Sequence, residues 1–199
     1  SQGETDVQEA VQQMAEGIVR GVSRLHGVVD AMLDVSLIEA QAFTVHPSLV
    51  SLKHIIEQVL DNLALTLQER QQTATASGLE DLPHMMADST RLHQALRNVL
   101  INAIKFTPDG GKLHVKTRLL DGGTAVEIAI TDSGIGIDPE HHELIFEKFY
   151  RVDSSNTAVG GLGLGMNIVK EIVDAHDGTI TIDSSLGKGT CVKISLPKK

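Results

Sequence analysis

Aromatic residues, cysteine and basic residues are all scarce in this 199-residue sequence, and each scarcity excludes a class of protein. There is no tryptophan, one tyrosine and four phenylalanines, too few rings for the stacking platforms that bind single-stranded nucleic acid. A single cysteine, Cys191, excludes an internal disulfide framework and a cysteine-based zinc site. With 17 basic and 26 acidic residues the net charge is −9, so no nucleic-acid partner is expected.

Long apolar runs are missing as well. No stretch approaches the roughly 18–20 residues that a membrane span needs, and the first residues do not have the pattern of a signal peptide. The hydrophobic content of 41% is nevertheless enough to build a core. We therefore expect a soluble, cytoplasmic protein with no membrane contact within this chain, a result compatible with a membrane-anchored parent protein.

The first forty residues carry an apolar repeat with alternating steps of four and three. Its members are Val7, Val11, Met14, Ile18, Gly21, Leu25, Val28, Met32 and Val35. This period of 3.5 residues predicts a long helix that packs along a seam against other helices. The partner could come from sequence outside this chain, from a second chain, or from both. The alternative is an ordinary amphipathic helix folded onto its own domain.

Pro47 and its polar surroundings mark a joint, which divides the sequence into residues 1–45 and 46–199. Beyond the joint, hydrophobic periodicity predicts helices over Leu52–Glu69, Ser89–Phe106 and Leu164–His176. Strands are predicted over Thr73–Ser77, His84–Ala87, Lys112–Leu120, Thr124–Asp132, Thr179–Ser184 and Thr190–Leu196. Ser89 is the predicted N-cap of its helix. Grouped helices with hairpin-connected strands indicate an α+β, two-layer α/β sandwich.

Three polar residues share one face of the second of these helices. Asn98, Asn102 and Lys105 lie at positions i, i+4 and i+7. Amide oxygens suit Mg²⁺, and an ammonium group suits phosphate. The alternative is the plain polar face of an amphipathic helix.

A second candidate segment follows an apolar strand. Asp132 ends the strand, and Gly134 and Gly136 allow something flat or bulky to approach closely. An ionised carboxylate suits a ligand with an exocyclic amino group, and Ile135 and Ile137 could line the face of a ring. The alternative is a tight turn in which Asp132 bonds the amides of the turn itself.

A third segment, Gly160–Val169, has glycines two residues apart that run into a helix. Unhindered N–H groups and the positive end of a helix favour phosphate, although the spacing fits neither a P-loop nor a dinucleotide fold. A glycine hinge is the alternative. Just upstream, Phe146 and Phe149 predict a loop anchored on buried aromatics, and the polar stretch from Asp153 to Gly160 predicts a lid.

Taken in order, these segments resemble the N, G1, F and G2 boxes of sensor histidine kinases. The matching patterns are Asn-x3-Asn-Ala-x-Lys-Phe, Asp-x-Gly-x-Gly, Phe-x2-Phe-Tyr-Arg and Gly-x-Gly-x-Gly. The resemblance covers about residues 50–199 and implies the Bergerat-type ATP-binding sandwich of the GHKL superfamily, which includes gyrase and heat-shock chaperones. Asn98 stands where the gyrase and chaperone branch has a water-activating Glu. Because an amide cannot act as a general base, we expect phosphoryl transfer rather than rapid hydrolysis.

The resemblance also implies roles for the matching residues around ATP and Mg²⁺. Asn102 would ligate Mg²⁺ with help from Asn98, and Lys105 would contact phosphate. Asp132 would accept from the adenine amino group, while Gly134 and Gly136 make room for the base. Asn98, Lys105 and Arg151 form the expected catalytic set.

Other matching residues would complete the nucleotide site. Tyr150 and Arg151 would approach the ribose and phosphates from the lid, and Ile137 and Thr190 would flank the base. The triphosphate would be wrapped by Gly161, Gly163, Leu164 and Gly165. Leu162 departs from the pattern, since a small hydroxyl residue is usual there.

The phosphoacceptor of the resembling family is missing from this sequence. None of the nine histidines has a His-Glu/Asp-x-Arg-x-Pro setting, and His141 is interpreted as a surface residue. The N-terminal helix resembles the second helix of the family's dimerisation hairpin, so the acceptor helix is expected outside this chain, which would be unable to autophosphorylate. The resemblance implies a homodimer and a response regulator as partners. A stand-alone serine kinase of the anti-sigma type is the alternative, and a scaffold with a lapsed pocket is a third hypothesis.

Overall fold

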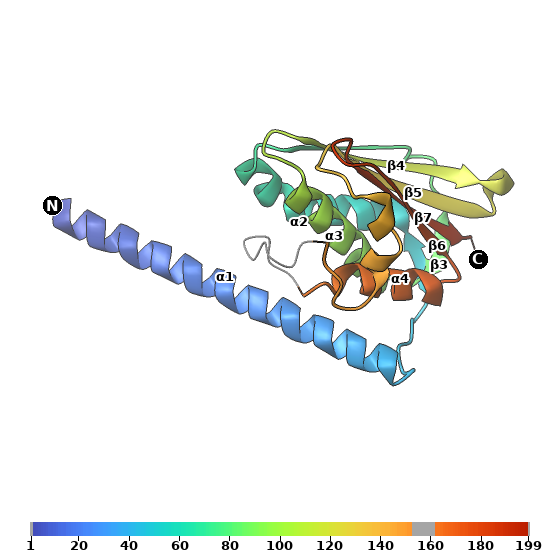
Figure 1. Ribbon diagram of the computed structural model, residues 1–199, viewed down its shortest axis with the longest axis horizontal. Helices are drawn as coiled ribbons and strands as arrows, with labels where there is room; N and C mark the ends of the chain where they lie inside the picture. Colours follow the sequence, from blue (N-terminus) through green and yellow to red (C-terminus); the bar gives the residue numbers. More distant parts are fainter. Residues whose placement is uncertain (1, 153–161, 199) are drawn as a thin grey trace. The chain divides into compact units, whose positions relative to one another are not determined.

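The computed structural model describes residues 2–152 and 162–198, which form two units, Ser1–Phe43 and Thr44–Lys199. The first unit is dominated by one uninterrupted helix, α1 (Gln2–Glu39) (Figure 1). Apolar residues of the predicted stripe are exposed along this helix, namely Val11, Met14, Ile18, Leu25 and Met32. In the part of the chain that is described, no helix combines the length and the apolar character needed to cross a membrane.

The second unit is built from three α-helices, a five-stranded sheet and a two-stranded sheet. Its helices are α2 (Leu52–Glu69), α3 (Ser89–Phe106) and α4 (Gly165–Ala175). Its strands are β1 (Ser48–Ser51), β2 (Thr73–Ser77), β3 (His84–Ala87), β4 (Lys112–Leu120), β5 (Ala125–Asp132), β6 (Thr179–Ser184) and β7 (Thr190–Pro197). Single 3₁₀ turns occur at η1 (Asp121–Gly123), η2 (Pro139–His141) and η3 (Leu144–Phe146).

The larger sheet has the strand order β2-β4-β5-β7-β6. Only the pair β2–β4 is parallel, and the other neighbours are antiparallel. The three helices cover one face of this sheet (Figure 1). The predicted α+β, two-layer sandwich is therefore confirmed.

The core lies between the sheet and the helices. Alternate residues of the central strands point into it, and these are Leu113, Val115, Val126, Ile128, Ile130, Val192, Ile194 and Leu196. Register aligns them across the strands, since Ile130 pairs with both Val115 and Val192. The period-two pattern of the sequence thus selects the buried face of the sheet.

Two local features differ from the sequence-based expectation. Strand β1 was not predicted, because only Val50 of its four residues is buried and the hydrophobic signal is correspondingly weak. The predicted N-cap Ser89 is wrong. Asp88 is the cap, because its backbone is extended (φ −84°) and its carboxylate accepts from the Arg91 amide at 3.1 Å.

Candidate functional site

Helix α3 presents Asn98, Asn102 and Lys105, all half-buried, along one face. Within the described residues, the side-chain amides of Asn98 and Asn102 have no hydrogen-bond partner. Their amide oxygens are therefore not used by the fold and can accept from, or coordinate, a ligand.

Asp132 closes β5 and is held by backbone amides from two directions. Its Oδ1 accepts from the N–H of Gly134 at 2.7 Å and from the N–H of Thr190 at 3.2 Å. The pairing of β5 with β7 places Thr190 there, because Thr131 is opposite Cys191. Among the described residues Oδ2 has no hydrogen-bond partner. Burial raises the pKa of the Asp132 carboxyl, and the two amide hydrogen bonds oppose this shift only in part.

The glycines beside Asp132 permit close packing of the chain against itself. A Cβ on Gly134 would lie 2.6 Å from the Phe106 carbonyl oxygen. Gly136 and Gly189 have φ near +72° and +82°, and a Cβ on either would lie 2.0 Å from a backbone oxygen. These positions require glycine for the fold of the loop, while the room they would give a base stays a prediction.

The loop after Asp132 is attached to α3 and to the β6–β7 hairpin. The Ile135 amide donates to the Phe106 carbonyl at 3.2 Å. The buried Ser184 hydroxyl accepts from the Ile137 amide and donates to the Gly189 carbonyl, both at 2.8 Å. Sequence reasoning missed Ser184, since a serine at the end of a strand carries no signal of its own.

The segment from Phe146 to Arg151 is anchored differently from the prediction. Phe149 is 60% exposed with φ of +64°, so the expectation of two buried aromatic anchors is wrong for this residue. Backbone atoms provide the anchors instead. The Phe149 amide donates to the Gly163 carbonyl at 3.1 Å, and the side-chain amide of Asn167 donates to the Phe146 carbonyl at 3.0 Å.

Tyr150 is oriented by His141. The Tyr150 hydroxyl and Nδ1 of His141 lie 2.8 Å apart in a hydrogen bond. His141, interpreted from the sequence as a surface residue, is half-buried, and no sequence pattern indicated this contact. Arg151 is half-buried, whereas Gly161 and the predicted lid, 153–160, lie outside the described residues.

The first turn of α4 faces α3. A Cβ on Gly165 would lie 3.9 Å from Cγ of Asn98, and Gly165 is the first residue of α4. Leu164 is buried, so only its backbone can contribute to a site. Amides at the start of a helix lack intrahelical partners and carry positive partial charge, which favours an anion between α4 and Asn98.

The donor set fits an adenine nucleotide with Mg²⁺. The spare oxygen of Asp132 can accept from an amino group, while Lys105 and the start of α4 favour phosphate. No group of three or more His, Cys, Asp or Glu residues within 2–152 and 162–198 could hold a metal ion. A divalent ion would therefore depend on amide oxygens together with the phosphates of the nucleotide.

Comparison with known proteins gives a family match over residues 87–199, more than half of the chain, to the histidine kinase-, DNA gyrase B-, and HSP90-like ATPases. The sensor-like histidine kinase SenX3 of Mycobacterium tuberculosis is 32% identical over 96% of this chain and 46% of its own. The sensor histidine kinase WalK of Bacillus subtilis is 30% identical over 88% of this chain and 29% of its own. The chain thus spans less than half the length of these curated relatives, both of which are sensor kinases.

Solved structures show the same architecture. Full-length ShkA in complex with AMPPNP superposes with a TM-score of 0.78 at 27% identity, covering 88% of this chain and 36% of that one. The catalytic domain of the histidine kinase ThkA gives a TM-score of 0.67 at 27% identity, covering 77% of this chain and 96% of that domain.

Proposed function

Because the chain belongs to the family of histidine kinase-, DNA gyrase B- and HSP90-like ATPases, we propose that it is the Mg-ATP-binding catalytic part of a two-component sensor histidine kinase. One observation carries the proposal most directly. Asp132 is fixed by two amides on Oδ1 and keeps Oδ2 without a hydrogen-bond partner among the described residues. An acceptor fixed in this way suits the amino group of adenine.

The base end of the proposed site is formed by the loop after β5. Asp132 accepts from the adenine amino group, and Gly134 and Gly136 let the loop fold around it. Ile137 and Thr190 flank the base, and both are fixed through the Ser184 hydroxyl, which lies 3.0 Å from Oγ1 of Thr190. Specificity for adenine would follow from this fixed acceptor.

The phosphate end lies between α3 and α4. Asn102 holds Mg²⁺ with Asn98 beside it, and Lys105 contacts phosphate. Mg²⁺, when bound, neutralises charge on the phosphates. Backbone amides of Gly161, Gly163, Leu164 and Gly165 surround the triphosphate.

Tyr150 and Arg151 approach the ribose and phosphates from the segment that follows η3. The hydrogen bond of Tyr150 to His141 holds its ring in place for this contact. Together with Asn98 and Lys105, Arg151 completes the proposed catalytic set.

The proposed reaction is transfer of the γ-phosphate to a histidine on a helix outside this chain. Asn98 cannot remove a proton from water, which disfavours hydrolysis. This chain alone is then unable to autophosphorylate. The curated relatives favour this function over a stand-alone serine kinase.

The exposed apolar stripe of α1 supports its proposed role as the second helix of a dimerisation hairpin. The proposed partners are a second copy of the full-length protein and a response regulator, and the proposed location is the cytoplasm. The exposed stripe needs an apolar surface to pack against, and in the proposed homodimer the acceptor helix and the second copy would supply it.

Calorimetric titration of the chain with ATP tests the proposed function. We expect binding with Mg²⁺ and at least about tenfold weaker binding with EDTA, because the phosphates then lose their counter-charge. Asn102→Ala should reproduce the EDTA result, and GTP should bind more weakly than ATP. Radiolabelled ATP should leave no label on this chain alone. Equal affinity for ATP in wild type and Asn102→Ala, or stable labelling of the chain, would contradict the proposal.

A further inference from the structure

The last turn of α3 has carbonyl groups that its own helix cannot satisfy. In a regular helix the Ile104 carbonyl accepts from the residue four positions later, but that residue is Pro108, which has no N–H. The last bond of this type joins the Thr107 amide to the Ala103 carbonyl at 3.1 Å. From Ile104 onward the carbonyl groups need partners from elsewhere in the fold.

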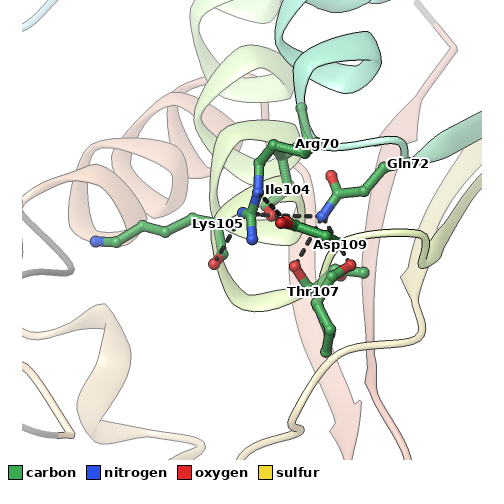
Figure 2. Close-up of polar contacts among 7 residues, drawn as sticks. Arg70, Gln72, Ile104, Lys105, Thr107 and Asp109 are labelled. Atoms are coloured by element: carbon green, nitrogen blue, oxygen red, sulfur yellow. Dashed lines mark hydrogen bonds and ion pairs between the residues drawn. The ribbon is translucent and has the colours of Figure 1, made fainter.

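The side-chain amide of Gln72, the last residue before β2, lies buried against this end of α3 (Figure 2). Its Nε2 donates to three carbonyl oxygens, those of Ile104 at 3.1 Å, Thr107 at 2.7 Å and Pro108 at 3.2 Å. A single NH₂ group thus replaces the missing helical donors and joins the helix to the loop that follows it.

Arg70 adds a cation at the same place. Its Nη1 donates to the carbonyl oxygen of Ile104 and, at 3.3 Å, to that of Lys105. Its Nε donates to Asp109 at 2.9 Å (Figure 2). The ion pair with Asp109 is exposed and contributes little stability by itself, but it fixes the plane of the guanidinium group. A positive charge here also complements the negative end of the helix dipole.

Backbone geometry brings both side chains to α3. Gln71, the second residue after α2, adopts a left-handed conformation with φ of +53°. The Gln72 amide then donates back to the Leu67 carbonyl at 2.9 Å, and the Gly110 amide donates to the Arg70 carbonyl at 3.0 Å. The corner is therefore held both by α2 and by the loop after α3.

The turn held by Arg70 and Gln72 is the turn that carries Lys105. Figure 2 shows the Lys105 side chain extending away from this cluster, although its carbonyl oxygen faces Arg70. The next carbonyl, of Phe106, accepts from the Ile135 amide in the loop after Asp132. The same turn therefore joins the two ends of the proposed nucleotide site.

We propose that Arg70 and Gln72 are positioning residues for nucleotide binding. They hold the last turn of α3 so that Lys105 reaches phosphate while the Phe106 carbonyl stays bonded to the adenine loop. This inference rests on the proposed function. Neither residue touches the nucleotide, and both act through the backbone of α3.

Titration of the folded chain with Mg-ATP and with adenosine, followed by NMR, tests this inference. The variants are Arg70→Leu and Gln72→Leu, with Arg118→Leu as the matched control. Arg118 also pairs with a carboxylate, Glu127 at 2.6 Å, but on the β4–β5 hairpin. Measurements are made where circular dichroism shows each variant to be folded. Should Gln72→Leu not fold, Arg70→Leu, whose side chain is partly exposed, carries the test.

Arg70→Leu and Gln72→Leu should each weaken Mg-ATP binding about tenfold, the effect of one misplaced charged contact, and adenosine binding less than about threefold. Arg118→Leu should change neither. Arg70→Lys should recover the ATP affinity only in part, because an ammonium group cannot replace the planar fork. A lowered melting temperature with unchanged ATP affinity, or full recovery by Arg70→Lys, would overturn the positioning role. Failure of the wild type to bind either ligand would instead overturn the proposed function and this inference with it.

Discussion

Asp88 directly follows β3 and Asp132 is the last residue of β5. Both accept hydrogen bonds from backbone amides, but their surroundings shift their pKa values in opposite directions. Burial raises the pKa of Asp88, yet amide hydrogen bonds outweigh burial and hold it below its usual value. One oxygen accepts from the His46 amide at 2.9 Å and the other from the Arg91 amide at 3.1 Å. At Asp132 both amides donate to the same oxygen, and burial dominates, so the pKa is raised.

The difference separates a carboxylate that serves the fold from one that fits a ligand. Asp88 uses both oxygens to cap α3 and to fix the chain before it, so its charge is stabilised by the protein itself. Asp132 is half-buried and uses only Oδ1 for the fold, so Oδ2 is left to accept from a hydrogen-bond donor on a ligand.

Asp132→Asn should have the largest effect of the changes that test this contrast. The amide keeps an oxygen for Gly134 and Thr190 but loses the charged acceptor, so ATP affinity should fall about ten- to hundredfold. Stability at neutral pH should stay equal or rise, because partial burial disfavours the charged form of this carboxyl and the amide carries no charge. Calorimetry and urea unfolding measure the two quantities. An ATP affinity equal to that of the wild type would contradict the proposed ligand-binding role of Asp132.

His176→Leu tests whether the region around Asp88 serves the fold alone. Nε2 of the buried His176 accepts from the Asp88 amide at 3.0 Å, and its Nδ1 lies 2.7 Å from the Ile172 carbonyl. Leucine leaves this amide and this carbonyl unpaired, so the free energy of unfolding should fall by about 1–3 kcal/mol. ATP affinity of the folded variant should match the wild type, and a selective loss of ATP binding would argue that the Asp88 region also serves the ligand.

Asp88→Ala should destabilise the chain by about 1–2 kcal/mol, the usual effect of losing an N-cap. Urea unfolding measures the loss. Asp88→Asn provides the control, since asparagine also caps helices well and keeps an oxygen for the Arg91 amide, although it cannot also accept from the His46 amide. It should lose less stability than Asp88→Ala, and a loss as large in Asp88→Asn would show that the N-cap hydrogen bond is not what stabilises the chain here.

The smallest effect is in the pH dependence of stability. Because folding lowers the pKa of Asp88, its carboxylate stabilises the fold at pH values above the pKa that it has in the unfolded chain. This stabilisation is lost as the pH falls through the pKa of the folded state. Because folding raises the pKa of Asp132, its protonated carboxyl favours the fold at pH values below the pKa that it has in the unfolded chain. This contribution is lost as the pH rises through the pKa of the folded state. Relative to wild type, Asp132→Asn should therefore gain stability between about pH 3 and pH 7, whereas Asp88→Asn should lose it. Parallel curves for both variants would contradict the opposite shifts.

Local sequence patterns were enough to predict most elements and the layers of the second unit. Residues repeating every 3.6 or every two positions have only one face to bury, so Leu92, Leu96 and Val99 predicted α3, and Ile128 and Ile130 predicted β5, before any contact was known. The spacing of Asn98, Asn102 and Lys105 likewise determined that they share a helix face. Strand β1 lacked this signal, because only Val50 of its four residues is buried.

Contacts between residues far apart in the chain could not be predicted in this way, because they depend on the complete fold. Ser89 and Asp88 are both good caps, and the backbone conformation selected Asp88. Gln72 became a helix cap because folding placed it beside carbonyl groups more than thirty residues away. His141 met Tyr150, and Thr190 met Asp132, for the same reason. The periodicity of apolar residues indicates which face of an element is buried. A hydrogen bond between distant residues depends instead on the positions that the backbone takes in the complete fold.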